Sequence, residues 1–318
     1  MVVKKHQPGH LCMMKWLLLI FVIIFRPYEI QAWGFYGHRA VNKFACFALP
    51  PEMFGFYKSN IDYLINHSVD PDKRRHSDPA EAPRHFIDAD HYGENPFDTL
   101  PIYWKDAVEK FTEDTLQAYG IGPWYINKMF YRLVEAFRKN DPDAILYYSA
   151  NIGHYIADSH VPLHCTENYN GQMTNQHGIH GLWESRLPEL FASNYDYFMG
   201  RCQYIDKIQP FIWSAVHDSY AALDSVLAFE KLLTESIESD EKYSFEQRGS
   251  TTIQVYSYDF SEQFHLILNG QVERRLQASI IDVASIWYTA WVEAGMPVLN
   301  PWTVIEDEKV EVGGEDFH

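Results

Sequence analysis

The sequence predicts an all-α protein built as a single multi-helix domain. Apolar residues recur every three or four positions in several long segments, whereas the alternation typical of half-buried strands is scarce. No internal repeat and no domain-splitting linker interrupts the chain. Hydrophobic residues make up 47% and aromatic residues 16% of the 318 residues, which is enough to fill a sizeable core. We therefore expect one domain over residues 33–300.

Capping residues and helical periodicity place the longest elements. The pair Asp141 and Pro142 supplies an N-cap and a first-turn proline, so a helix should begin there and end before Pro162. Gly295 is the expected end of the last helix. The other predicted helices cover residues 37–49, 123–139, 207–235 and 260–294. Long loops are expected near residues 88–103, 165–178 and 239–258, and residues 301–318 form an acidic, irregular tail.

The first 32 residues have the composition of a cleavable secretory signal peptide. A basic stretch precedes an unbroken apolar run over residues 16–25, and a short polar stretch ends at Ala32. This run is shorter than the roughly 20 residues that a membrane-spanning helix needs. An uncleaved membrane anchor is the alternative. Cleavage after Ala32 would make Trp33 the mature N-terminus and would make the protein secreted or periplasmic.

Charge and cysteine content exclude two further classes of protein. Removal of residues 1–32 takes away four of 26 basic and one of 43 acidic residues, which leaves a formal net charge of −20. Such a chain lacks the broad basic surface that binds duplex DNA, although a bound metal ion can still attract a phosphate substrate locally. The three remaining cysteines, Cys46, Cys165 and Cys202, allow at most one disulfide, so the fold is not a disulfide scaffold.

Residues 154–184 contain five side chains of the kinds that bind zinc. These are His154, Asp158, His164, His180 and Glu184. Two pairs are four residues apart, so the members of each pair share one face of a helix. A surface ion pair is the ordinary explanation of such spacing. Here the side chains lie among apolar residues, where charged groups are rarely left unpaired, and this indicates a metal site.

Further candidate ligands lie upstream. Asp70 lies in the segment HSVDPDK, His85 begins the segment HFIDADH, and His38 follows Trp33 by five residues. A free α-amine at Trp33 would have a pKa near ~8, low enough for a metal ion to displace its proton. Its neighbouring carbonyl could complete a chelate.

In order and spacing these residues resemble the superfamily of bacterial zinc-dependent phospholipases C and single-strand-specific nucleases of fungi and plants. Members are all-α enzymes with three zinc ions in a cleft. Their pattern has an N-terminal Trp with a nearby His, then an Asp, a His, H-x3-D-x5-H and H-x3-[DE]. The matching residues here are Trp33, His38, Asp70, His85, His154, Asp158, His164, His180 and Glu184. The resemblance covers residues 33 to about 190.

The resemblance implies three ligand sets and a hydrolytic reaction. The implied sets are Asp70, His85, His154 and Asp158; Trp33, His38 and Asp158; and His164, His180 and Glu184. The implied chemistry is phosphoester hydrolysis by a metal-activated water. Asp70 is the candidate that orients or deprotonates this water, and its alternative role is that of a plain ligand or cap.

Several features resemble the nuclease branch of the superfamily. Phe86 and Asp88, in the segment after His85, would stack on a base and bind its edge. Their alternative roles are core packing and a turn cap. Lys73, three residues after Asp70, would bind phosphate, although the nucleases usually have Arg there and Lys lacks the bidentate geometry. Glu184 also departs from the nucleases, because the acid at this position is Glu in the phospholipases.

We therefore expect an endonuclease that acts on single-stranded DNA or RNA, with nucleotide 3′-phosphates as a further substrate. The enzymatic alternative is a phospholipase C that hydrolyses phospholipid head groups. A non-enzymatic zinc protein is a third interpretation. Structural zinc sites close their coordination shells with protein ligands, whereas these sets leave room for water. No stable protein partner is implied.

Overall fold

The computed structural model describes residues 34–248 and 251–305, and almost all of their regular structure is helical. This confirms the predicted all-α class. The α-helices are α1 (Gly34–Ala48), α2 (Pro51–Ser59), α3 (Ile61–His67), α4 (Asp70–Arg74), α5 (Pro96–Thr99), α6 (Trp104–Phe111), α7 (Glu113–Ala118), α8 (Gly122–Lys139), α9 (Pro142–Ser159), α10 (Ile179–Gly181), α11 (Leu187–Phe191), α12 (Ile208–Ser236), α13 (Tyr258–Ile267) and α14 (Gln271–Glu293). Short turns are η1 (Ala82–His85), η2 (Ala89–Tyr92), η3 (Pro162–Cys165), the π-helical η4 (Leu182–Arg186) and η5 (Ala192–Asn194).

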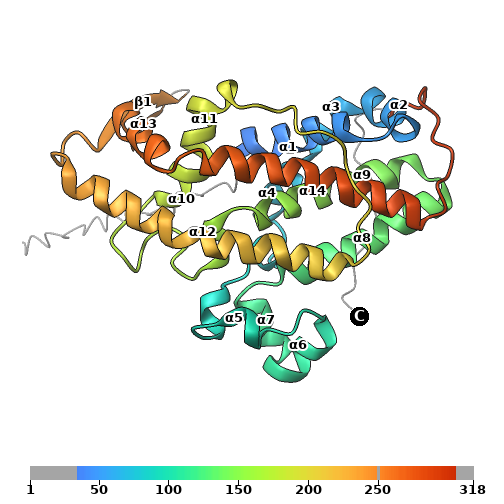
Figure 1. Ribbon diagram of the computed structural model, residues 1–318, viewed down its shortest axis with the longest axis horizontal. Coiled ribbons are helices and arrows are strands. Elements are labelled where there is room, and N and C mark those ends of the chain that lie inside the picture. The colour runs from blue at the N-terminus through green and yellow to red at the C-terminus, as the bar shows by residue number, and fades with distance from the viewer. Residues whose placement is uncertain (1–33, 249–250, 306–318) are drawn as a thin grey trace, which may run out of the picture.

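The main body is a bundle of long helices around α9 and α14. Helices α1, α8 and α12 pack against this pair (Figure 1). Trp287 of α14 is fully buried, stacks on Tyr57 and donates a 3.1 Å hydrogen bond from Nε1 to the carbonyl oxygen of Ser149. Burial of such large aromatic side chains contributes to the stability of this core.

The two helices predicted from periodicity and caps, α8 and α9, form as expected. Asn140 ends α8 in the left-handed conformation, with a φ of 51°. The carboxylate of Asp141 then caps α9 by accepting a 3.1 Å hydrogen bond from the amide of Ala144. Helix α9 ends at Ser159, before Pro162. The residue pattern therefore fixes which turns of α9 carry its candidate ligands.

Helices α1 and α9 approach each other closely at Gly153. A Cβ at this position would lie 2.0 Å from Oδ1 of Asn42, so only glycine fits. The amide nitrogen of the Asn42 side chain donates to the carbonyl oxygens of Ala150 (3.0 Å) and Leu64 (3.2 Å). These contacts hold α1, α3 and α9 together and bring the start of α1 over the middle of α9.

The region predicted as one helix over residues 260–294 consists of two. Asn269 and Gly270 separate α13 from α14, and both have positive φ (48° and 73°). Asn and Gly are the residues that adopt this conformation most readily. The chain therefore turns where the apolar periodicity alone suggested continuity.

The predicted loop over residues 239–258 contains the two strands of the described chain. Strands β1 (Tyr243–Arg248) and β2 (Thr251–Tyr256) pair antiparallel, with Tyr243 opposite Tyr256. Arg186 of η4 forms an ion pair of 2.5 Å with Glu246 of β1, which fastens the hairpin to the helical body. The loop prediction was wrong here because each strand is only six residues long and the hairpin is stabilised by tertiary contacts.

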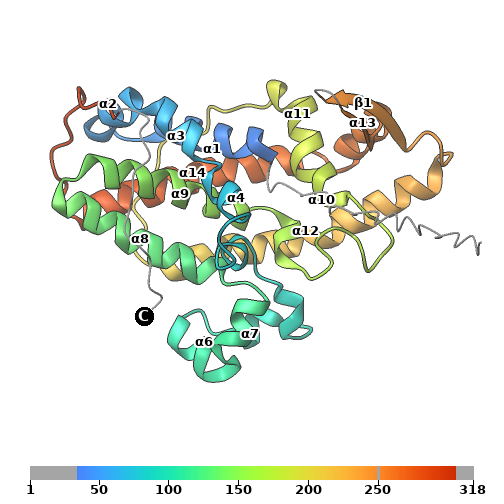
Figure 2. The ribbon, with the colours of Figure 1, turned by 180° about the vertical axis from the view of Figure 1, so that it is seen from behind.

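Helices α5, α6 and α7 form a small lobe beside the bundle, as Figures 1 and 2 both show. A second apolar cluster that includes Leu116, Trp124 and Trp213 joins this lobe to α8 and α12. The predicted loop over residues 88–103 contributes η2 and α5 to it. All three cysteines of the described ranges are free. None of the described helices has the length and apolar character needed to span a membrane.

Candidate metal centre and adjoining pocket

Helix α9 and the turn η3 carry the side chains at the middle of the candidate site. His154 and Asp158 lie one turn apart on α9, and His164 follows on η3 after Pro162. All three side chains are buried, although histidine and aspartate normally prefer solvent. Such residues are buried at a cost unless each finds a partner or a metal ion. Three groups of side chains converge here.

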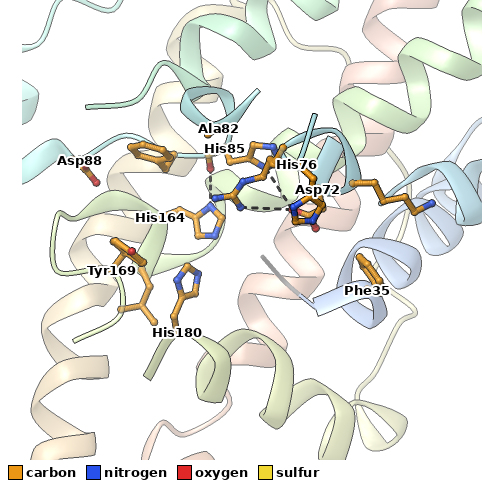
Figure 3. Close-up of a pocket in the computed structure, with 13 residues that line it drawn as sticks. Phe35, Asp72, His76, Ala82, His85, Asp88, His164, Tyr169 and His180 are labelled. Carbon is orange, nitrogen blue, oxygen red and sulfur yellow. Dashed lines mark hydrogen bonds and ion pairs between the residues drawn. The ribbon is translucent and has the colours of Figure 1, made fainter. Parts of the chain in front are cut away.

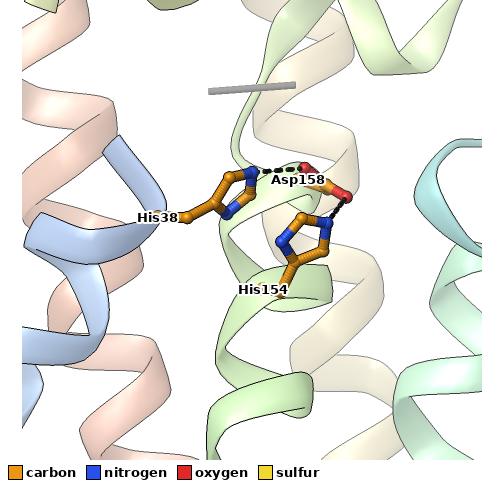
Figure 4. Close-up of side chains that lie close together, drawn as sticks. All are labelled: His38, His154 and Asp158. Atoms are coloured by element: carbon orange, nitrogen blue, oxygen red, sulfur yellow. Dashed lines mark ion pairs between the residues drawn. The ribbon is translucent and has the colours of Figure 1, made fainter. Parts of the chain in front are cut away.

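The first group, the α1–α9 cluster, consists of His38, His154 and Asp158 (Figure 4). The rings of His38 and His154 stack with centroids 3.8 Å apart. Nε2 of His38 lies 3.5 Å from Oδ1 of Asp158, and Nε2 of His154 lies 3.3 Å from Oδ2 of the same carboxylate. The close approach of α1 and α9 at Gly153 makes this arrangement possible.

The second group, the Asp72 cluster, consists of Asp72, His85 and His154. Nδ1 of His85 lies 3.0 Å from Nε2 of His154 and 3.9 Å from Oδ1 of Asp72. The same Nδ1 lies 2.9 Å from Oδ2 of Asp158. Asp158 therefore faces this cluster with one oxygen and the α1–α9 cluster with the other, as a carboxylate that bridges two ions would.

The third group, the Glu184 cluster, consists of His164, His180 and Glu184. Oε2 of Glu184 lies 3.0 Å from Nε2 of His180 and 3.4 Å from Nε2 of His164. His180 belongs to α10 and Glu184 to the π-helical turn η4, a kind of distortion often found at functional sites. The predicted four-residue spacing thus brings both side chains to one point.

The polar atoms of these clusters fit a cation. Many of them are fully buried and have no hydrogen-bond partner within the described residues, which is costly for carboxylate oxygens and imidazole nitrogens. These atoms include both nitrogens of His38 and His180, both carboxylate oxygens of Asp72 and Glu184, Oδ1 of Asp158 and Nε2 of His164. Imidazole and carboxylate are ligands that zinc accepts, so metal ions would satisfy the buried atoms.

The acidic side chains and His38 are held in the ionisation states that bind cations. Burial favours the neutral acid, yet the facing imidazoles of His154 and His164 hold the pKa of Asp158 well below its usual range. His180 and His164 likewise lower the pKa of buried Glu184. Burial and the neighbouring His154 lower the pKa of His38 and keep its ring neutral. Ionised carboxylates and a neutral imidazole are the forms that coordinate metal ions.

The structure places Asp72, rather than the predicted Asp70, in the metal cluster. The side chain of Asp70 is 28% exposed and accepts hydrogen bonds from His67 and from Lys73, the latter at 2.8 Å. Asp72 is only 5% exposed and faces His85 and His154. Residues two apart on a helix point in nearly opposite directions, so only one of them can face α9.

A pocket of about 500 Å³ opens beside the clusters (Figure 3). Its lining combines ligand side chains with basic and apolar ones. The lining residues are Phe35, Asp72, Lys73, Arg75, His76, Ala82, His85, Phe86, Asp88, Leu163, His164, Tyr169 and His180. All three residues predicted to bind substrate, Lys73, Phe86 and Asp88, belong to this lining. The predicted ligand Trp33 lies outside the described residues.

A family model for zinc-dependent phospholipase C matches residues 37–244, which contain all three clusters. The chain belongs to the zinc-dependent phospholipase C family. A solved structure, the alpha toxin from Clostridium absonum, is similar with a TM-score of 0.45 and 13% sequence identity. The match covers 83% of this chain and 65% of the toxin, so the chain spans just under two thirds of the toxin's length. No curated protein matches the sequence.

Membership of the zinc-dependent phospholipase C family confirms the predicted superfamily and indicates zinc as the metal. The description of the family names the phospholipase activity, which is the alternative of the sequence analysis, and not the nuclease activity.

Sequence reasoning missed Arg75 as a pocket residue. Its guanidinium lies 3.9 Å from Oδ1 of Asp72, and its side chain is 34% exposed, so it reaches both the cluster and the cavity. The signal was present in the spacing: Arg75 follows Asp72 by three residues, as Lys73 follows Asp70.

Asp88 lies at the end of the pocket away from Phe35 (Figure 3). Burial and the nearby carboxylates of Asp90 and Glu167 together raise the pKa of its carboxyl to about 7. Asp90 is held by the hydroxyl of Thr166 (2.6 Å) and the amide of Glu167 (3.0 Å). This end of the pocket therefore carries negative charge that a cation would stabilise.

Proposed function

We propose that the protein is a secreted phospholipase C that hydrolyses the head-group phosphodiester of phospholipids with three bound zinc ions. The observation that carries this proposal is a set of three buried ligand clusters, two of which contribute side chains to the wall of one pocket: Asp72 and His85 from the Asp72 cluster, and His164 and His180 from the Glu184 cluster. Membership of the zinc-dependent phospholipase C family supports the choice of substrate. Secretion rests on the signal-like composition of residues 1–32.

The proposed ligand sets take Asp72 in place of Asp70. Asp72, His85, His154 and Asp158 would hold one ion; His38, Asp158 and the terminus at Trp33 a second; and His164, His180 and Glu184 a third. When bound, zinc supplies Lewis acidity and a water molecule of lowered pKa. The shared carboxylate of Asp158 would fix the spacing of the first two sites, and Asp72 would orient the water.

Basic residues of the pocket would bind the substrate phosphate. Arg75 and Lys73 reach the cavity from the same helical segment as Asp72. A guanidinium can donate two parallel hydrogen bonds to phosphate oxygens, so Arg75 would orient the group, whereas Lys73 adds a point charge. The ion pair of Arg75 with Asp72 aims the guanidinium toward the ligand cluster.

The remainder of the pocket suits a phospholipid with a cationic head group. Asp88 would attract a choline or ethanolamine nitrogen, and the ring of Phe86 beside it offers a face for cation–π contact. The apolar side chains of Phe35 and Leu163, together with the 47% exposed Tyr169, would accept the glycerol and the upper acyl chains. A single cavity thus provides groups that match each chemical part of the substrate.

The deciding experiment uses the purified, secreted, zinc-loaded protein on four substrates: phosphatidylcholine, phosphatidylethanolamine, single-stranded DNA and RNA. We expect release of phosphocholine and phosphoethanolamine, and loss of this activity after chelation. The Asp158→Asn variant, prepared in parallel, controls for contaminating enzymes. Release of nucleotides without any phosphorylated head group would contradict the proposal.

A nuclease is the second candidate, and one observation favours it. Phe86 and Asp88 both line the pocket, as expected of residues that stack on a base and bind its edge. The nucleic-acid arms of the same experiment test this candidate. Hydrolysis of both substrate classes at comparable rates would show that the enzyme recognises the phosphodiester itself and not the groups attached to it.

A further inference from the structure

Two histidines of the candidate metal centre, His154 and His164, are held in defined orientations by hydrogen bonds on the side away from the clusters. Nδ1 of His154 donates to the carbonyl oxygen of Ser68 (2.8 Å), and Nδ1 of His164 donates to the carbonyl oxygen of His85 (2.7 Å). A neutral imidazole has one N–H, so these bonds leave the unprotonated Nε2 of each ring facing the metal clusters. Backbone carbonyls therefore set the tautomer of both rings.

His85 has the opposite orientation. Its Nδ1 faces the clusters, because it lies 2.9 Å from Oδ2 of Asp158 and 3.0 Å from Nε2 of His154. Its Nε2 is buried and points away from them, toward Oε1 of Glu81 at 3.6 Å. To act as a ligand through Nδ1, His85 must carry its proton on Nε2. A carboxylate is the group best suited to hold that proton.

Glu81 is rigidly held in this place. Its side chain is fully buried, and Oε2 accepts hydrogen bonds from Nη1 of Arg84 (2.7 Å) and Nε of Arg74 (3.2 Å). The hydroxyl of Tyr155 donates a short hydrogen bond to Oε1, the oxygen that faces His85. Arg74 is fixed in turn by a 2.6 Å hydrogen bond to Oδ1 of Asn151. These partners fix the position of Oε1 independently of any metal ion.

The charges around Glu81 keep it ionised. Burial favours the neutral acid, but His85, Arg74 and Tyr155 together hold the pKa of this carboxyl far below its usual value. Two arginines face this carboxylate, and one of them, Arg84, also lies 3.8 Å from Asp78. Oε1 is therefore placed to accept the Nε2–H of His85.

We propose that Glu81 is a positioning residue that selects the Nε2–H tautomer of His85 and thereby makes Nδ1 of this ring a zinc ligand. The inference rests on the metal centre of the proposed function and not on its substrate. It assigns His85 a mode of ligation opposite to that of His154 and His164. Loss of the group behind a ligating histidine lowers metal affinity by roughly 10- to 100-fold in other zinc sites.

The test is the Glu81→Gln variant, which keeps the shape of the side chain and removes its charge. Zinc affinity is measured by competition with a chromophoric chelator. The protonated nitrogen of each ring is identified by long-range 1H–15N spectra of protein labelled in histidine, with His85 assigned through a His85→Gln sample. We expect wild-type His85 to show Nε2–H with Nδ1 bound to zinc. In Glu81→Gln, one zinc should bind roughly 10- to 100-fold more weakly.

Asp282→Asn is a matched control. Asp282 accepts a 3.0 Å hydrogen bond from Nε2 of His160, another buried histidine, which belongs to none of the three clusters. The chemical change is the same, a carboxylate behind a buried imidazole replaced by an amide. We expect this variant to lose thermal stability while its zinc affinity and the His85 spectrum stay unchanged.

Two outcomes would overturn the inference alone: unchanged zinc affinity in Glu81→Gln, or a wild-type spectrum with Nδ1–H on His85. If Glu81→Gln does not fold, Glu81→Asp replaces it, since aspartate keeps the charge facing Arg74 and Arg84 but withdraws the carboxylate from His85. Unchanged zinc affinity in that variant counts equally against the inference. A wild-type protein that binds no zinc would instead overturn the proposed function as well.

Discussion

At the scale of single residues, the chemistry of the site depends on which aspartate of the segment DPDK faces α9. Asp72 lies against His85 and His154, whereas Asp70 pairs with His67 and Lys73 near the surface. We expect Asp72→Asn to lose one equivalent of zinc and at least about 100-fold in kcat, because a ligand and a charge disappear together. Metal analysis and steady-state kinetics measure both effects.

Asp70→Asn is the natural control for that variant, since it makes the same chemical change two residues away. It should keep its full zinc content and most of its activity, because an exposed ion pair contributes only about 0–1 kcal/mol to stability. If Asp70→Asn loses zinc and Asp72→Asn retains it, then Asp70 is the zinc ligand and not Asp72.

His164 makes the stability of the metal-free protein depend on pH. Burial opposes protonation, but facing Asp158 and Glu184 raises the pKa of His164 to about 9. In the unfolded chain the pKa of this imidazole is about 6.5. The protonated ring therefore stabilises the folded state fully below pH 6.5, and this stabilisation is lost as the pH rises through about 9.

The melting temperature of chelated protein should therefore fall between about pH 6.5 and pH 9.5. Zinc replaces the proton on a ligand, so the zinc-loaded protein should melt at a nearly constant temperature over this window. Thermal scans of both forms at several pH values measure the difference. A chelated protein that becomes more stable toward pH 9 would refute the assigned shift.

The proposed substrate-binding role of Asp88 comes with a cost in stability. The pKa of the Asp88 carboxyl is about 7 in the folded protein and about 3.9 in the unfolded chain. Ionisation of this group therefore destabilises the folded state. The effect is complete above pH 7 and absent below about pH 3.9. Asp88→Asn should melt a few degrees higher at pH 8 and equally at pH 4, because about 1 kcal/mol shifts the melting temperature of a large domain by about 2–4 °C. The same variant should raise the KM for phosphatidylcholine.

At the scale of helices, the contact between α1 and α9 determines how the α1–α9 cluster is assembled. A methyl group at Gly153 would collide with the side chain of Asn42, so Gly153→Ala should separate the helices. Overpacking of this kind costs about 1–3 kcal/mol, measured as a lower midpoint in urea. Zinc affinity should fall too, since His38 moves away from His154 and Asp158.

Gly181→Ala provides the comparison at helix scale. Gly181 ends α10 next to His180, and a Cβ there would contact nothing within 4 Å. Alanine favours the helical conformation by about 1 kcal/mol over glycine, so this variant should be neutral or slightly stabilised and should bind zinc normally. Equal destabilisation by both substitutions would show that contact at Gly153 is not the cause.

The sequence predicted elements where local chemistry determines them. Asp141 and Pro142 specify the start of α9 because a cap and a proline act within one turn. The order of the histidines then predicted the clusters that α9, η3 and η4 assemble. The rotation of α4, which selects Asp72, depends on packing against a distant helix and has no local signal. The same holds for the hairpin, because the ion pair that fastens it to the helical body comes from Arg186, far away in the sequence.

At the scale of the whole molecule, the negative charge opposes binding to anionic membranes. The full chain has a formal net charge of −17, and the basic residues of the pocket are few. Anionic lipid creates a surface potential that acts over a Debye length, about 8 Å at physiological ionic strength. Hydrolysis of phosphatidylcholine should therefore slow when anionic lipid is mixed into the vesicles at low salt.

Added salt should restore that rate, because it screens the repulsion between protein and vesicle. Pure phosphatidylcholine vesicles, which carry no net charge, serve as the reference and should show little dependence on salt. Initial rates of head-group release over a range of ionic strength measure both cases. Faster hydrolysis on anionic vesicles at low salt would contradict this expectation and would point to local attraction by Lys73 and Arg75.

The sharing of ligands between clusters has a thermodynamic consequence. His154 belongs to two clusters, and the carboxylate of Asp158 faces both. An ion that occupies one of them would already restrict both side chains, so its neighbour would bind with less loss of conformational entropy. Repulsion between the two cations opposes this gain in affinity, and the single carboxylate of Asp158 only partly offsets the repulsion. The zinc affinities of the α1–α9 cluster and the Asp72 cluster would therefore be coupled, positively if the entropic gain is larger and negatively if the repulsion is larger. The Glu184 cluster shares none of its three side chains with the other two, so it would bind its ion independently.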